Sequence, residues 1–137
     1  MAKEEEADIS KTLSEYESLE KQLEVVLIQK NQLMLQIAET KNSLEELKQA
    51  KGDVYRSIGS IIMKTTKDEA ENKLKEKLEL MEVKQKAVSK EEEKLRKVIL
   101  ELQTKLKEKL IFRLQKTAFL IHPKATILKQ NIKKVLP

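Results

Sequence analysis

The stretch Asp53–Glu69, written DVYRSIGSIIMKTTKDE, differs in composition from the sequence on either side of it. The flanking sequence is rich in Lys, Glu, Leu and Gln, whereas this stretch holds closely spaced β-branched residues around Gly59-Ser60. Two β-prone runs on either side of a two-residue turn that begins with glycine predict a β-hairpin. The register that this turn imposes pairs Ile58 with Ile61, Ser57 with Ile62, Arg56 with Met63, Tyr55 with Lys64, and Val54 with Thr65.

Sequence signals for the end of one helix and the start of another flank the predicted β-hairpin. Gly52 is expected just past the end of a first helix, as a left-handed cap that glycine adopts without steric cost. Thr66 and Glu69 have the spacing of a capping box, and Asp68 adds a favourable charge to the start of a second helix. An ordinary loop with some apolar residues is the alternative to the hairpin.

Both flanking arms show the heptad pattern of a coiled coil, because apolar residues recur at alternating spacings of three and four. In the second arm, the polar residues Gln85 and Glu92 at a positions cost stability but can fix register. Leu13, Leu27 and Leu35 lie off the seam and widen the apolar face. In the first arm the a positions are Ile9, Tyr16, Leu23, Lys30, Ile37 and Leu44, and the d positions are Thr12, Leu19, Val26, Leu33, Thr40 and Leu47. In the second arm the a positions are Leu78, Gln85, Glu92, Ile99 and Leu106, and the d positions are Leu74, Met81, Val88, Leu95 and Leu102.

Arms of matching length around a short hairpin predict a mainly α fold, an antiparallel two-helix coiled-coil hairpin with one short β-hairpin between the arms. Leu47 is then expected near Leu74, and Ile9 near Leu110. The alternative is that the arms pair with other chains. The predicted segments are an N-terminal arm (1–52), a β-hairpin assembly module (53–66), a C-terminal arm (67–121) and a basic apolar tail (122–137).

Composition excludes most enzyme chemistries. Of the 137 residues 37% are charged and only 3% aromatic, which is typical of long helices rather than of a compact core. There is no cysteine, and two glycines cannot build a phosphate-binding loop. The single histidine, His122, has no neighbouring ligand, and the glutamates at 91–93 fit a solvated face. No catalytic residue, cofactor or metal site is therefore expected.

The N-terminal sequence and the distribution of charge indicate where the protein is located and which partners it binds. The acidic N-terminus does not have the pattern of a secretory signal, and no apolar run approaches the ~20 residues of a membrane span, so a cytoplasmic protein is expected. Residues 1–52 hold 7 basic and 11 acidic residues, residues 53–110 hold 15 and 12, and residues 111–137 hold 6 and 0. Mixed charge along the arms argues against a nucleic-acid groove, and no membrane partner is expected.

A two-stranded hairpin is marginal in water, and its edges invite further strands. Because nothing else in the chain is available to cover its apolar side chains, the hairpin is expected to pair with copies of itself or with related subunits. The predicted oligomerisation residues are Val54, Tyr55, Ile58, Gly59, Ile61, Ile62 and Met63.

The segment Tyr55–Lys64, followed by Lys67-Asp68 and the ladder Leu74, Leu78 and Met81, resembles the β-type subunit of prefoldin in its archaeal form. The resemblance implies a hexamer of two α-type and four β-type subunits, whose hairpins form a platform. It further implies coiled-coil tips that hold unfolded proteins without ATP and deliver them to a group II chaperonin. The linker has room for one hairpin, which fits a β-type rather than an α-type subunit. A structural coiled-coil scaffold that binds one folded partner is the alternative function.

Residues 111–137 depart from the family pattern, because they are apolar and basic where family tails are short and polar. The second helix is expected to continue until Pro123, and residues from Phe119 on to overhang the first arm. Extra packing, disorder, or contact with anionic lipid or nucleic acid are alternatives to client binding. The acidic residues 1–8 are expected to neutralise part of the charge of residues 111–137. The predicted client-contact residues at the tip are Ile9, Leu13, Leu106, Leu110, Phe112, Leu114, Phe119, Leu120 and Ile121.

Overall fold

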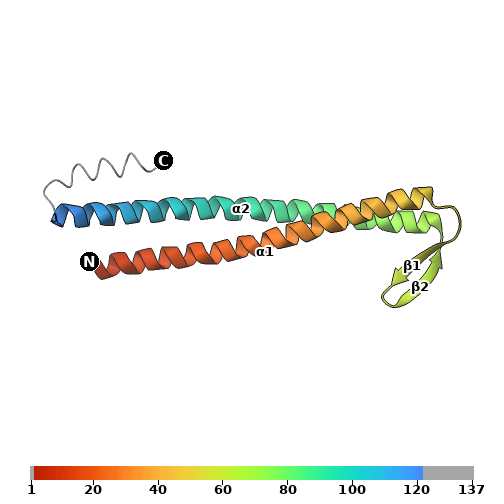
Figure 1. Ribbon diagram of the computed structural model, residues 1–137, viewed down its shortest axis with the longest axis horizontal. Helices are drawn as coiled ribbons and strands as arrows, with labels where there is room; N and C mark the ends of the chain where they lie inside the picture. The colour runs from red at the N-terminus through yellow and green to blue at the C-terminus, as the bar shows by residue number, and fades with distance from the viewer. Residues whose placement is uncertain (1, 122–137) are drawn as a thin grey trace. The chain divides into compact units, whose positions relative to one another are not determined.

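The computed structural model describes residues 2–121 and consists of two long helices joined by a β-hairpin (Figure 1). Helix α1 spans Ala2–Gln49, strand β1 Val54–Ile58, strand β2 Ile61–Thr65, and helix α2 Lys67–Ile121. The predicted fold class is confirmed: two helical arms enclose one antiparallel two-stranded sheet. The predicted tail, residues 122–137, lies outside the described part of the chain.

The helices contribute to two compact units. One is formed by α1 up to Leu23 with α2 from Lys94 onward, and the other by the segment Glu24–Glu93, which includes the β-hairpin. We call these the tip unit and the hairpin unit. Each holds an antiparallel pair of helical segments and is described by itself.

The predicted heptad seam is confirmed in both units. Every predicted a and d position is buried or half-buried, whereas most neighbouring positions are exposed. Helix–helix contact therefore runs along one narrow stripe on each helix, as in a coiled coil. All of the buried residues between positions 3 and 120 belong to this seam: Thr12, Val26, Ile37, Thr40, Leu47, Met81, Leu95 and Leu106.

Two of the buried seam residues are threonines, and both satisfy their hydroxyl groups locally. The Thr12 hydroxyl donates to the carbonyl oxygen of Asp8 at 2.9 Å, and the Thr40 hydroxyl donates to that of Gln36 at 2.8 Å. A buried hydroxyl that is hydrogen-bonded costs far less than an unpaired one. The small threonine side chains therefore sit in the seam without leaving a buried polar atom unsatisfied.

Two of the polar residues at a positions, Lys30 and Glu92, meet across the hairpin unit. Lys30 Nζ lies 2.7 Å from Glu92 Oε1, and the side chains are 30% and 14% exposed. Shifting the helices by one heptad would place Glu92 opposite Leu23 or Ile37, at the cost of desolvating its carboxylate without this partner. The pair therefore favours the observed register, which is the role expected of polar a positions.

The start of α2 follows the predicted capping box. The backbone N–H of Glu69 donates to Thr66 Oγ1 at 3.2 Å, and the Thr65 hydroxyl donates to the Glu69 carboxylate at 3.1 Å. Thr66 alone separates β2 from α2. The β-hairpin is thus attached to α2 without a flexible linker.

The end of α1 differs from the prediction. The helix ends at Gln49, so Gly52 lies too far along the chain to be its cap. The amide of Ala50 instead donates to the Leu47 carbonyl at 3.2 Å, and Lys67 Nζ donates to the Lys48 carbonyl at 3.0 Å. Gly52 has φ +119°, a value that favours glycine, and turns the linker 50–53 toward β1.

A double-mutant cycle on Lys30→Ala and Glu92→Ala should give a coupling energy of ~1 kcal/mol, because the pair is largely desolvated. The exposed pair of Glu45 with Lys48 provides a control, and its coupling should stay below ~0.5 kcal/mol. Urea unfolding of the variants, followed by far-UV circular dichroism, measures both values. Equal coupling in the two pairs would contradict a register role for Lys30 and Glu92.

Candidate assembly and binding surfaces

The β-hairpin has the predicted register at all five pairs, from Val54 opposite Thr65 to Ile58 opposite Ile61. Gly59 has φ +60°, and Ser60 is not among the residues with positive φ, so the turn follows the type II′ pattern with glycine first. A Cβ at position 59 would meet no atom within 4 Å. Glycine is therefore required by the backbone conformation and not by lack of space.

Apolar side chains cover both faces of the β-hairpin and are exposed to solvent. Ile58, Ile61 and Met63 share one face, and they are 49%, 61% and 52% exposed. Tyr55 and Ile62 lie on the other face, with exposures of 59% and 73%. Only Val54 and Thr65, next to the helices, are half-buried. All the predicted oligomerisation residues are thus gathered in one small sheet with two free edges.

The second candidate surface is the tip, which we define as residues 3–13 of α1 and 105–120 of α2. Most of the predicted client-contact residues are exposed there: Leu13, Leu110, Phe112, Leu114, Phe119 and Leu120 range from 44% to 77%. Ile9 is half-buried and Leu106 is buried, because both occupy a positions of the seam. Leu106 therefore holds the helices together and offers no surface to a client. Ile121 is the last described residue of α2, and its side chain lies outside the described part.

A groove of about 190 Å³ lies between the two helices at the tip. Ile9 and Phe112 supply its apolar side chains, and charged residues surround them. The prediction that Ile9 lies close to the region of Leu110 agrees with this placement. The residues that line the groove are Glu5, Asp8, Ile9, Lys109, Phe112 and Arg113.

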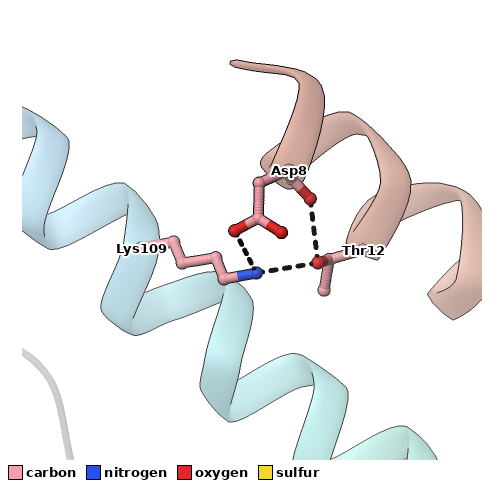
Figure 2. Close-up of polar contacts among 3 residues, drawn as sticks. All are labelled: Asp8, Thr12 and Lys109. Atoms are coloured by element: carbon pink, nitrogen blue, oxygen red, sulfur yellow. Dashed lines mark hydrogen bonds and ion pairs between the residues drawn. The ribbon is translucent and has the colours of Figure 1, made fainter. Parts of the chain in front are cut away.

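Lys109 joins the two helices at the tip (Figure 2). Its Nζ lies 2.7 Å from Asp8 Oδ2 and donates to Thr12 Oγ1 at 2.9 Å. The Thr12 hydroxyl in turn donates to the Asp8 carbonyl, so the three residues form one polar cluster. Lys109 occupies the d position that follows Leu102 and extends the seam with a polar contact.

Two further ion pairs join the helices beyond this cluster. Arg113 Nη2 lies 2.6 Å from Glu6 Oε1, and Lys116 Nζ lies 3.2 Å from Glu5 Oε1. The acidic start of the chain was expected to neutralise part of the basic C-terminal region. That expectation is confirmed for Arg113 and Lys116.

A second groove, of about 350 Å³, was not predicted from the sequence. The hairpin unit also exposes apolar residues on both helices, among them Ile28, Leu35 and Val83. A signal was present, because the stretch 25–38 contains a single charged residue, Lys30, in a chain that is 37% charged. Of these residues only Leu35 was noted as lying off the seam. The groove is lined by Gln29, Gln32, Leu33, Gln36, Lys84, Ala87 and Val88.

Shifted pKa values do not mark a reactive site. The pKa of Tyr16 is raised, mainly because its hydroxyl hydrogen-bonds to Glu20. The pKa of Glu71 is lowered, mainly by its hydrogen bond to Lys75 on the same helix. Both shifts come from local helix pairs, away from the β-hairpin strands and from the tip.

Residues 10–111 match the family model described as prefoldin subunit. This chain belongs to the prefoldin family. It is 38% identical over 100 residues to prefoldin subunit beta of Thermococcus kodakarensis, covering 72% of this chain and 86% of the relative. It is also 38% identical over 96 residues to prefoldin subunit beta of Pyrococcus furiosus, covering 69% of this chain and 82% of the relative.

A solved prefoldin structure supports the same assignment. The crystal structure of the prefoldin beta subunit from Thermococcus strain KS-1 matches with a TM-score of 0.69 and 35% identity. The match covers 74% of this chain and 90% of that chain. The prefoldin family model spans the β-hairpin, whereas Phe112 and the tip residues after it lie beyond the matched range.

Within residues 2–121, neither α1 nor α2 contains a segment apolar and long enough to traverse a lipid bilayer.

The substitution Gly59→Ala should destabilise the β-hairpin by ~1 kcal/mol, because a left-handed backbone is unfavourable for a residue with a Cβ. Amide hydrogen exchange in β1 and β2 should then become roughly fivefold faster, while exchange along the helices stays unchanged. Ser60→Ala alters the neighbouring turn position without this strain and serves as the control. Similar exchange rates in both variants would contradict the type II′ turn.

Proposed function

We propose that this chain is a β-type subunit of a prefoldin hexamer with two α-type and four β-type subunits. In this proposal it acts in the cytoplasm as an ATP-independent holdase, which captures unfolded polypeptides at the coiled-coil tips and delivers them to a group II chaperonin. One observation carries the proposal: an exposed apolar β-hairpin stands between the two helices of a chain that belongs to the prefoldin family.

The proposed assembly follows from the state of the hairpin in the single chain. A two-stranded sheet with apolar residues on both faces is marginal in water and leaves two edges unpaired. Pairing with hairpins of other subunits would satisfy the edges and bury side chains such as Ile61 and Ile62. The proposed partners are hairpins of other β-type copies and of α-type subunits.

The proposed capture of clients relies on the tip. Phe112, Phe119 and Leu120 are between 60% and 77% exposed, and basic residues lie among the apolar ones. Exposed apolar patches of this kind mark interaction sites, and a surface without a rigid binding pocket suits many unfolded partners. Chemistry on the client is not required, because binding alone prevents aggregation.

The substitution Ile61→Asp should prevent assembly with an α-type prefoldin subunit, because it places a charge in the interface between hairpins. Size-exclusion chromatography with light scattering should show a complex near six subunits for the unmodified chain and smaller species for the variant. Leu35→Asp is the matched control, since Leu35 is 62% exposed and Ile61 is 61% exposed. Assembly of the Ile61→Asp variant into the full complex would contradict the proposal.

The double substitution Phe119→Ser with Leu120→Ser should reduce suppression of aggregation of denatured proteins several-fold, because these are the most exposed apolar residues at the tip. Val83→Ser with Leu100→Ser removes residues of 65% and 63% exposure away from the tip and should leave suppression unchanged. Light scattering of several unrelated denatured proteins measures the effect. A chain that protects none of them would favour a structural coiled-coil scaffold.

A further inference from the structure

We propose that the three ion pairs between the helices at the tip form a reversible electrostatic clasp, which regulates how much apolar surface the tip offers. The clasp consists of Asp8 with Lys109, Glu6 with Arg113, and Glu5 with Lys116. This inference rests on the proposed function, because it concerns the same client-binding surface.

The helical segments that face each other in the tip unit carry opposite net charge. Residues 2–23 of α1 hold 7 acidic and 3 basic residues, and residues 94–121 of α2 hold 2 acidic and 8 basic residues. In the hairpin unit, the α1 residues 24–49 are nearly balanced, with 4 acidic and 3 basic residues. Electrostatic attraction between the helices is therefore concentrated in the tip unit.

Charged residues occupy the heptad positions of α2 at the tip. After Leu102 and Leu106 the positions that continue the heptads are Lys109, which is half-buried, and Arg113 and Lys116, which are exposed. On α1, the d position before Ile9 and Thr12 is Glu5. Beyond Ile9 and Leu106, contact between the helices is thus made by ion pairs with N–O distances of 2.6–3.2 Å rather than by buried apolar side chains.

These contacts have the properties of a reversible closure. The side chains of the three pairs are between 30% and 59% exposed, so salt screens their attraction. Hydrophobic contact along the rest of the seam does not weaken in the same way. Added salt, or charged segments of a client that compete for the same partners, should therefore separate the ends of the helices first.

Separation would add apolar surface where the groove now lies. Ile9 is half-buried against α2, and it shares the groove with Phe112. Four clasp residues, Glu5, Asp8, Lys109 and Arg113, line the same groove. Opening the clasp thus uncovers Ile9 and widens the apolar surface that Phe112 and Leu110 already present.

The absence of cysteine makes the opening measurable, since Lys3→Cys and Thr117→Cys introduce the only two labelling sites. Pulsed dipolar spectroscopy on spin labels at these sites reports the distance between the helix ends. The triple variant Glu5→Gln, Glu6→Gln, Asp8→Asn should raise the open population roughly tenfold, given the usual strength of three exposed pairs. Salt at ~1 M should open the unmodified clasp similarly.

Two variants test whether the pairs themselves cause the closure. The first is the control variant Glu4→Gln, Glu15→Gln, Glu17→Gln. It removes the same charge from α1 but keeps all three clasp pairs, so the distance between its spin labels should match that of the unmodified chain. Exchanging the charges, with Lys at 5, 6 and 8 and Glu at 109, 113 and 116, should restore the closed distance. A triple neutral variant that stays closed, or a control variant that opens equally, would overturn the clasp.

The regulatory role is tested on the same samples by suppression of aggregation of a denatured protein at low salt. The open triple variant should suppress aggregation several-fold more strongly than the unmodified chain. An open variant with unchanged suppression would overturn the regulation. If the unmodified chain opens with salt but protects no denatured protein, the proposed function is wrong, and so is the regulation. The measured distances separate this outcome from a clasp that is never closed.

Discussion

The narrowness of the helix–helix seam is the constraint on which the rest of the structure depends. The helices meet mainly along their a and d positions, and all buried residues between positions 3 and 120 lie on them. Two helices that pack along one stripe have no further interior in which to bury side chains. Large apolar residues off the stripe, such as Ile62 and Phe119, therefore face solvent in the single chain.

Because the seam is narrow, different interactions hold different parts of the molecule together. Apolar residues join the helices along most of the seam, with the Lys30–Glu92 pair selecting the register. At the tip, ion pairs of Lys109, Arg113 and Lys116 join the helices, and salt screens such exposed pairs. At the β-hairpin, backbone hydrogen bonds define the shape and leave edges free for further strands. The two surfaces with proposed functions thus lie where the apolar seam ends.

Periodicity and local turn chemistry explain which features could be predicted from the sequence. The heptads gave the seam residue by residue, and Gly59-Ser60 gave the strand register, because both depend on spacing along the chain. The end of α1 was placed wrongly, because Lys67 from the other helix caps the Lys48 carbonyl and no glycine is needed. Leu106 is buried because it continues the a positions, and its nearness to the tip alone does not separate it from the exposed apolar residues there. The groove lined by Gln32 and Ala87 could not be predicted, because uncharged residues outside the a and d positions follow no characteristic spacing.

The β-hairpin is joined to its two helices by unequal connections. Residues 50–53, with Gly52 at φ +119°, separate β1 from α1, whereas Thr66 alone separates β2 from α2 and is also the N-cap of that helix. Short, capped connections transmit torque, and longer ones that contain glycine dissipate it. A rotation imposed on the hairpin by neighbouring subunits would therefore turn α2 about its axis more than α1. The orientation of the hairpin is thus tied more closely to the first turn of α2 than to the last turn of α1.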